Sequence, residues 1–352
     1  MSSRHIVDRF IAARDAGEAL VLVTVYQTLG STYSKAGARM LITAGGESQG
    51  LVSGGCLEGD LAERARRVLA DERATTVTYD LRDEADELFG LGIGCNGLIR
   101  VVLQPLTAAA GYEPMASIAD ALLGDDVAAI ATVIESADEA VPVGATLVHR
   151  GGQSRVFGTD RAALAAFESG CKIAAGRREA ELATGESGAT VLFAPLIPVP
   201  RVLILGAGLD AVPLVNVAAE LGWRVSVADH RQGYIERRGF ERAEHKHLVE
   251  PSRLASVTPE RYDAIIVMTH HLDTDRVLLK ALADVDVPYI GLLGPPARRE
   301  RLIAELGDAG QVLDKKLRGP VGIDIHADSA ETIALSIAAE IQSVLTTTSA
   351  SG

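Results

Sequence analysis

Cys56 stands in a turn whose composition suits a reactive thiol. The stretch LVSGGCLEGD places this cysteine after Gly54 and Gly55 and just before residues with helical spacing. At the N-terminus of a helix, the helix dipole lowers the pKa of a thiol and favours the thiolate. Glu58 opposes that effect through its charge, yet its carboxylate could accept a proton. We predict catalytic roles for Cys56 and Glu58, with Gly54 and Gly55 in a cofactor-binding loop.

A second cysteine has similar neighbours. Cys95 follows Gly94 in the stretch GLGIGCNG, where the glycines would let the backbone approach a ligand closely. Cysteine is also a small apolar residue that is often buried, as we expect for Cys171. A single cysteine would fit that structural role, but two in glycine-flanked turns favour one shared pocket. Cys95 is then a third catalytic candidate, and Cys56 and Cys95 are candidate ligands for sulfur or a thiophilic metal.

A hydroxyl-rich loop with two cations precedes both cysteine turns. The stretch GSTYSKAGARM offers hydroxyl groups, backbone amides and two basic side chains. Such groups together suit a phosphate-bearing anion. We therefore expect Ser31, Lys35 and Arg39 to bind the anionic part of a ligand whose soft atoms meet the cysteines.

The stretch GAGLDA has the form of a dinucleotide-binding loop, GxGxxA, placed between an apolar run and a helix. Gly206 would make the tight turn, and Gly208 would let a pyrophosphate approach the backbone. Asp210 suits the dipole at the start of the helix but would repel a pyrophosphate. A Rossmann fold that keeps this turn without binding a dinucleotide is the alternative.

Three further residues belong to the same candidate dinucleotide site. Asp229 ends the next apolar run, about 20 residues on, where a carboxylate can accept a hydrogen bond from a ribose hydroxyl. Arg231 could instead support a 2′-phosphate, so NAD and NADP both stay open. His270 follows a later strand and would face the crevice, as an acid, a base, a ligand or a hydrogen-bonding group only.

The sequence predicts two different sets of helices and strands that position these residues. Before residue 195, glycine-rich loops separate expected strands at 19–25, 38–43, 75–79 and 98–103 and a helix from about 56 to 71. After residue 200, short apolar strands alternate with amphipathic helices, which is typical of a parallel sheet covered on both faces. The fold class is therefore α/β, with a glycine-loop α/β or α+β domain followed by a Rossmann-like, doubly wound domain.

Prolines mark the expected domain boundary. Three prolines stand within FAPLIPVP, and they disfavour regular structure. We predict an N-terminal domain at 1–194 with a β-rich extension from about 111 to 194. A proline-rich linker at 195–200 and a C-terminal domain at 201–352 follow.

Composition excludes several classes of function. The chain has 352 residues and a formal net charge of −13, so it should repel the phosphate backbone of nucleic acids. It has three cysteines and no CxxC pair, which argues against a zinc ribbon. No secretory signal core and no uncharged apolar run of the required ~18 residues is evident. We expect a soluble cytoplasmic protein.

In order along the chain, these motifs resemble the XdhC/CoxI family. The N-terminal part matches at GSTYSKAGARM, SGGCLEGD and GLGIGCNG, and the C-terminal part at VLILGAGLDAVPLVNVAAELGWRVSVADHR, VMTHHLDTD, PYIGLLG and GPVGIDIHADSAETIALSIAAEI. The resemblance covers nearly the whole chain.

The resemblance implies a maturation protein for enzymes of the xanthine dehydrogenase and carbon monoxide dehydrogenase type. Such a protein binds the molybdenum cofactor (molybdopterin), protects it while a cysteine desulfurase supplies the terminal sulfur, and inserts it into an apo molybdenum hydroxylase. It also implies a homodimer, with Cys56 and Cys95 on the molybdenum side. This favours a cofactor chaperone over a catalyst. An NAD(P)-dependent oxidoreductase and an adaptor that only docks partner enzymes are the alternatives.

Overall fold

The computed structural model describes residues 3–80, 97–185 and 188–350, with side chains described as far as 346. The chain divides into two compact units, Met1–Pro198 and Val199–Gly352. Among the described residues, no helix combines the length and the apolar character needed to cross a membrane.

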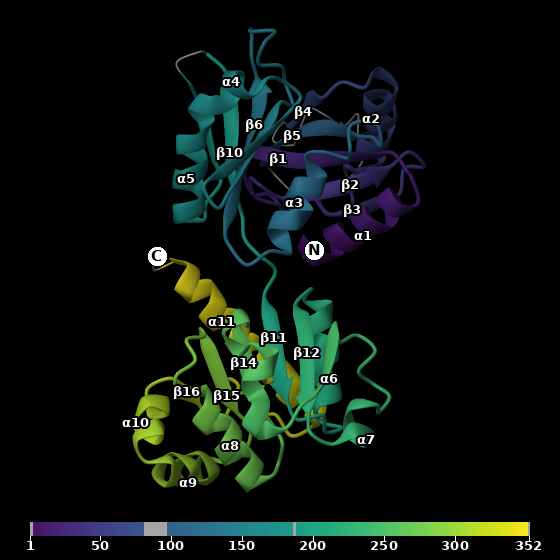
Figure 1. Ribbon diagram of the computed structural model, residues 1–352. Helices are drawn as coiled ribbons and strands as arrows, with labels where there is room; N and C mark the ends of the chain where they lie inside the picture. Colours follow the sequence, from purple (N-terminus) through teal and green to yellow (C-terminus); the bar gives the residue numbers. More distant parts are fainter. Residues whose placement is uncertain (1–2, 81–96, 186–187, 351–352) are drawn as a thin grey trace. The chain divides into compact units, whose positions relative to one another are not determined.

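The first sheet of the N-terminal unit is entirely antiparallel. In spatial order its strands are β3 (Ser48–Gly50), β2 (Arg39–Thr43), β1 (Leu20–Gly30), β5 (Gly97–Leu106) and β4 (Thr75–Asp80). Its helices are α1 (Ser3–Asp15), α2 (Glu58–Asp71) and α3 (Met115–Leu122). Helix α2 packs on one side of the sheet and α1 on the other (Figure 1).

Alternation along the strands separates the two faces of this sheet. Met40 and Ile42 of β2 join the apolar core under α2, together with Val21 and Val23 of β1. Because successive side chains of a strand point to opposite faces, Arg39 points to the face that α1 covers.

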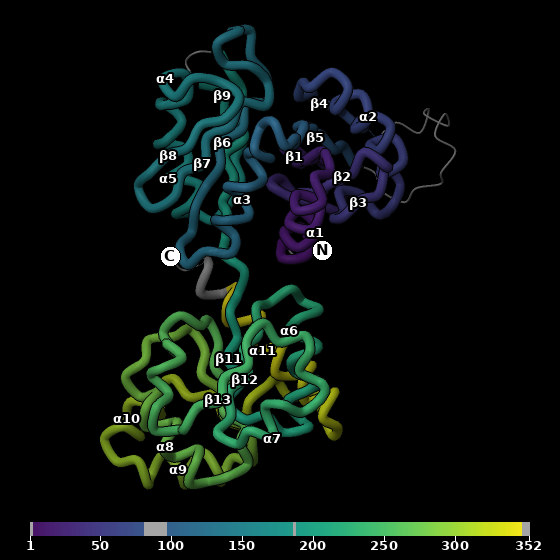
Figure 2. The backbone as a smooth tube through the Cα atoms, turned by 45° about the vertical axis from the view of Figure 1, so that its right-hand side comes forward, coloured from purple at the N-terminus to yellow at the C-terminus, as the bar shows by residue number. Residues whose placement is uncertain are grey.

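The second sheet of this unit is also antiparallel. Its spatial order is β8 (Gln153–Phe157), β7 (Thr146–Arg150), β6 (Ala128–Glu135), β10 (Thr190–Leu196) and β9 (Glu181–Thr184), and Figure 2 shows β8, β7 and β6 side by side. The short helix α4 (Arg161–Leu164), the 3-10 turn η2 (Ala165–Phe167) and α5 (Glu168–Arg177) cover one face. Cys171 is fully buried there, as predicted.

The proline-rich segment begins as a strand. Strand β10 continues through Pro195, which pairs with Ala129 of β6, although the prolines of 193–200 predicted irregular structure. Pairing of β10 with β9 ends at Phe193. Beyond Phe193, one edge of β10 is no longer hydrogen-bonded to β9. Proline is tolerated at such an edge, because its missing N–H is not needed for strand pairing.

The C-terminal unit has the doubly wound fold that the sequence predicts. Its six parallel strands lie in the order β13 (His245–Leu248), β12 (Arg224–Asp229), β11 (Arg201–Leu205), β14 (Ala264–Val267), β15 (Tyr289–Leu292) and β16 (Leu317–Arg318). In chain order this is 3-2-1-4-5-6, the arrangement of dinucleotide-binding domains. Strands β11, β12 and β13 are adjacent in Figure 2.

Helices cover both faces of this parallel sheet. One core holds side chains of α6 (Ala211–Glu220) and α11 (Ala330–Ala350), and the other holds side chains of α8 (Leu272–Leu282), α9 (Pro296–Leu306) and α10 (Asp308–Asp314). The short helix α7 (Gln232–Ile235) follows β12, and the turns η3 (Pro251–Val257) and η4 (Pro259–Arg261) precede β14.

The cysteine turn lies between β3 and the next helix. Strand β3 ends at Gly50, and residues 52–57 form a run of bends. Helix α2 begins at Glu58 with Leu57 as its N-cap residue, within two residues of the predicted start at about 56. The hydrogen bonds of this turn are described below.

The glycine that opens the GAGLDA loop provides a test of the fold. Gly206 has φ +119°, and a Cβ there would lie 2.6 Å from the Met268 carbonyl oxygen. Because a backbone atom cannot move aside cheaply, Gly206→Ala should lower the free energy of unfolding by roughly 2–4 kcal/mol. Trp223, the single tryptophan, is buried in this unit and reports its urea unfolding by fluorescence.

Gly233→Ala is the matched control. A Cβ at Gly233 would meet nothing within 4 Å, and the residue lies in α7. Alanine in a helix should leave stability unchanged or raise it by up to about 1 kcal/mol. Equal unfolding midpoints for the two variants would contradict the close approach of β11 and β14 at Gly206.

Candidate functional site

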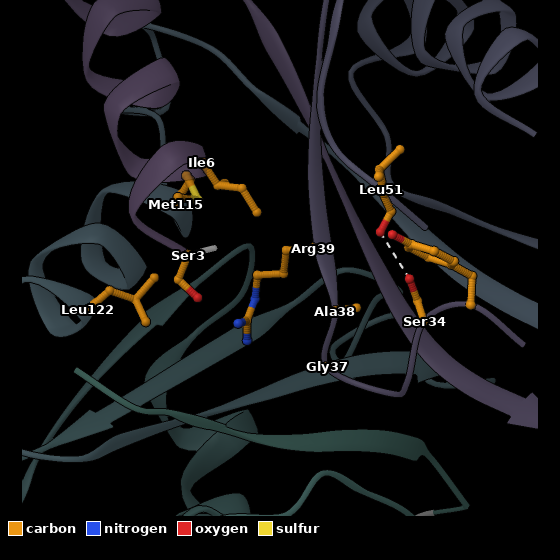
Figure 3. Close-up of a pocket in the computed structure, with 10 residues that line it drawn as sticks. Ser3, Ile6, Ser34, Gly37, Ala38, Arg39, Leu51, Met115 and Leu122 are labelled. Carbon is orange, nitrogen blue, oxygen red and sulfur yellow. Dashed lines mark hydrogen bonds between the residues drawn. The ribbon is translucent and has the colours of Figure 1, made fainter. Parts of the chain in front are cut away.

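Segments that the sequence singles out meet at one end of the first sheet. The Ser34 hydroxyl donates a hydrogen bond to the Leu51 carbonyl oxygen at 2.9 Å, which joins the hydroxyl-rich loop to the cysteine turn (Figure 3). Gly97 pairs with Gly30, and a Cβ on Gly97 would lie 2.6 Å from the carbonyl oxygen of Ser31. This sheet end is therefore the candidate functional site.

Ser53 and Glu58 hold the cysteine turn in shape. The Ser53 Oγ accepts hydrogen bonds from the amides of Cys56 at 3.1 Å and Leu57 at 3.0 Å. The Glu58 carboxylate accepts from the Ser53 hydroxyl at 2.6 Å, the Ser53 amide at 3.3 Å and the Leu57 amide at 3.1 Å. These bonds hold the turn that leads into α2, so the structure gives Glu58 a structural task. Its catalytic role stays a prediction.

Cys56 lies half-buried at this turn. It is a free cysteine, with its side chain against the edge of the core under α2. Gly54 and Gly55 are exposed, and a Cβ on either would meet nothing within 4 Å. Gly55 has φ +107°, a conformation that favours glycine. Both glycines therefore leave their side of the turn open among the described residues.

The two described cysteines differ in their surroundings. Burial, together with the nearby charge of Glu168, raises the pKa of the Cys171 thiol to about 12, so this thiol is inert at neutral pH. Gly94 and Cys95 lie outside the described residues, and the predicted pairing of the two cysteine turns stays a prediction. Within the described ranges, no three His, Cys, Asp or Glu residues are grouped to hold a metal ion.

The structure does not place the three predicted anion-binding residues at one site. Ser31 and Lys35 are exposed on the loop. Arg39 points into a pocket of about 220 Å³ that the start of α1, helix α3 and the hydroxyl-rich loop enclose (Figure 3). This pocket opens on the sheet face opposite to α2 and the core that Cys56 contacts. The structure therefore does not bring Arg39 and Cys56 together on one face.

In the C-terminal unit, Asp229 is already fully hydrogen-bonded. Its carboxylate, 1% exposed, accepts a hydrogen bond from the Ala207 amide at 2.9 Å. It also accepts hydrogen bonds from three groups of Arg231: the backbone amide and Nε, both at 2.9 Å, and Nη2 at 2.8 Å. Burial alone would raise the pKa of Asp229, but the bonds from Arg231 and the two amides outweigh it and lower the pKa. The two residues predicted to recognise a ribose thus bind each other.

Asp210 and His270 form a second pair over the glycine loop. The His270 Nε2 lies 2.7 Å from the Asp210 Oδ2, and the other carboxylate oxygen would lie 2.3 Å from a Cβ on Gly208. The carboxylate therefore stands over the glycine that a pyrophosphate must approach. The cavity at the strand ends, which Gly206 and Asp229 line, has a volume of only about 20 Å³.

Sequence reasoning missed two parts of the N-terminal site. The contact between Ser53 and Glu58 was not recognised, because Glu58 follows Ser53 by five residues, whereas the known capping-box pattern places the acid three residues on. Ser3, Met115 and Leu122 line the Arg39 pocket, yet they come from α1 and α3. No local signal in the sequence connects these helices to β2.

Comparisons with known proteins cover both units. The family model described as the XdhC and CoxI family matches residues 13–80, and the model described as the XdhC Rossmann domain matches residues 202–341. A Bacillus subtilis (strain 168) protein, named as a probable subunit of xanthine dehydrogenase, is 32% identical over 329 residues, which are 92% of each chain.

Two further similar proteins extend over almost the whole chain. The Escherichia coli (strain K12) protein named "Molybdenum cofactor insertion chaperone PaoD" is 24% identical over 97% of this chain and 88% of its own. A crystal structure of a Bacillus halodurans protein, described as a xanthine dehydrogenase, superposes with a TM-score of 0.78 at 28% identity. It covers 97% of this chain and 96% of its own.

Removal of the Glu58 carboxylate tests its role in holding the cysteine turn. Glu58→Ala leaves the Ser53 and Leu57 amides without these acceptors, so the free energy of unfolding should fall by about 1–2 kcal/mol. The measurement is differential scanning calorimetry of the N-terminal unit's transition. Glu63→Ala is the control. Among the described residues Glu63 forms an exposed ion pair with Arg67 on the same helix, and its loss should matter by less than about 0.5 kcal/mol. Equal losses would refute the assigned role.

Proposed function

This chain belongs to the XdhC and CoxI family, and from that premise we propose that it binds molybdenum cofactor and delivers it to a molybdenum hydroxylase. The names of the relatives support a maturation accessory role: one is named a probable subunit of xanthine dehydrogenase, and another a molybdenum cofactor insertion chaperone. Such a chaperone needs to hold its cargo reversibly.

The observation that carries the proposal is the free, half-buried Cys56 in a turn with two exposed glycines. The bound cofactor would bring a metal and soft sulfur atoms, which thiolates prefer as partners. Cys56 would meet that soft part, while Gly54 and Gly55 allow close approach of the backbone. Ser53 and Glu58 would keep the turn in place while the cargo enters and leaves.

Three finer roles complete the proposal. The chain would protect the cofactor while a cysteine desulfurase supplies its terminal sulfur, and it would do so as a cytoplasmic homodimer. Cys95 would act with Cys56 at the soft part of the cargo. The family resemblance supports these roles.

The pterin content of the purified protein tests the proposal. Protein from a molybdopterin-producing host should release a fluorescent pterin on oxidation, and Cys56→Ala should lower that yield by about tenfold because the soft contact is lost. Cys171→Ala removes a buried thiol from the core and should leave the yield unchanged. Absence of pterin, together with no uptake of added cofactor, would contradict the proposal. An unchanged yield in Cys56→Ala would favour a docking adaptor.

An NAD(P)-dependent oxidoreductase is the second candidate. The strand order of the C-terminal unit favours it, since this order is that of dinucleotide-binding domains. Against it, Asp229 and Arg231 bind each other, and Asp210 lies over Gly208. A dinucleotide would have to break both arrangements before it could bind.

Titration with NADH and NADPH separates the two candidates. We expect no saturable change in nucleotide fluorescence at concentrations on the order of 1 mM, because the buried ion pair and the Asp210 carboxylate oppose the ligand. Saturation below about 100 µM by either nucleotide would instead support the oxidoreductase.

A further inference from the structure

The Arg39 pocket is large enough for a small organic molecule. Its volume of about 220 Å³ exceeds that of a ~150 Å³ cavity able to take up benzene. Apolar side chains of Ile6, Met115 and Leu122 form part of the wall, and polar side chains of Ser3 and Tyr33 form another part. The lining therefore suits a molecule with a compact apolar body and one polar group.

Arg39 brings an unpaired positive charge into this pocket. Its Nε and Nη2 atoms are buried, and neither has a hydrogen-bond partner among the described residues. Burial lowers the pKa of the Arg39 guanidinium to about 10, so it still carries its charge at neutral pH. A buried charge without a partner is costly, which is why such groups are normally paired.

Other arginines that are largely covered show the usual arrangement. Arg298 lies 2.6 Å from a carboxylate oxygen of Asp275, and Arg224 lies 2.8 Å from one of Glu244. Arg39 lacks such a partner among the described residues, although both nitrogens on one edge of its fork are buried. The described residues therefore leave a place beside Arg39 for an anionic group.

We propose that this pocket binds an oxyanion, a phosphate monoester or a carboxylate, through the Nε and Nη2 atoms of Arg39. The planar fork of a guanidinium donates two parallel hydrogen bonds to either group. The first turn of α1 borders the pocket through Ser3 and Ile6, and the positive end of a helix dipole favours an anion there. The apolar walls take the body of the ligand.

The oxyanion site stands independently of the proposed cofactor binding. Two sources could supply the same chemistry: the phosphate of a bound pterin cofactor, or a separate small acid or phosphate ester. Arg39 and Cys56 serve opposite faces of the first sheet, so the two sites can be tested one at a time.

The first experiment measures the Tm of the protein's N-terminal unit by calorimetry with phenyl phosphate, benzoate or neutral benzyl alcohol. At a hundred times its Kd, phenyl phosphate or benzoate should raise the Tm by roughly 5–10 °C, and benzyl alcohol should not. Absence of any anion-dependent rise overturns the proposal, and this arm needs no variant.

The second experiment removes the positive charge of Arg39. Arg39→Met keeps much of the apolar stem, so without anion its Tm should rise, because an unpaired buried charge is gone. The affinity for phenyl phosphate or benzoate should fall about 10- to 100-fold. Arg67→Met is the control, since Arg67 is exposed and should leave both quantities unchanged. A lower Tm in Arg39→Met with an undiminished anion effect would show a structural arginine and overturn the proposal.

Pterin content of Arg39→Met identifies the source of the oxyanion. Loss of both pterin and the anion effect assigns the cofactor's phosphate to the pocket, and then places the cofactor on the sheet face opposite to Cys56. Retained pterin with a lost anion effect assigns a separate small acid or phosphate ester. Wild-type protein that binds phenyl phosphate or benzoate at Arg39 yet never carries pterin supports the oxyanion site and contradicts the proposed function alone.

Discussion

Strand alternation in β2 decides where the chemistry of the N-terminal unit lies. Met40 and Ile42 must face the core under α2, since that core holds the sheet and helix together. Arg39 is thereby forced to the opposite face, into a pocket that α1 and α3 close. A shift of one residue would bury the guanidinium in the α2 core, so the same apolar pattern that stabilises the sheet also fixes the position of the charge.

In both units, acidic side chains that look reactive in the sequence hold loops in place. Glu58 accepts hydrogen bonds from Ser53 and Leu57 and so shapes the turn that presents Cys56. Asp229 accepts from the Ala207 amide and pairs with Arg231, which stabilises the glycine loop from within. The two units differ in the space beside these loops. In the first unit Gly54 and Gly55 next to Cys56 are exposed, whereas the cavity at the strand ends of the second has a volume of only about 20 Å³.

The parallel domain could be predicted from the sequence because its signals are local. Each strand is a short apolar run, and each helix follows within a few residues, as around Gly206. The two-residue strand β16 was missed, since two residues carry no period. In the first unit, Ser31, Lys35 and Arg39 were expected to act together. Only the fold shows that Arg39 faces away from Cys56. The sequence could not show this, because the Arg39 pocket is closed by helices that are distant from β2 along the chain.

A crystal structure of the protein purified from a molybdopterin-producing host would test the central claim, that ligand binding belongs to the N-terminal unit. We expect the pterin cofactor beside the Cys56 turn, with the pair of Asp229 and Arg231 still intact in the C-terminal unit. A cofactor in the crevice beside Gly206, with that pair broken and the Cys56 turn unoccupied, would contradict it.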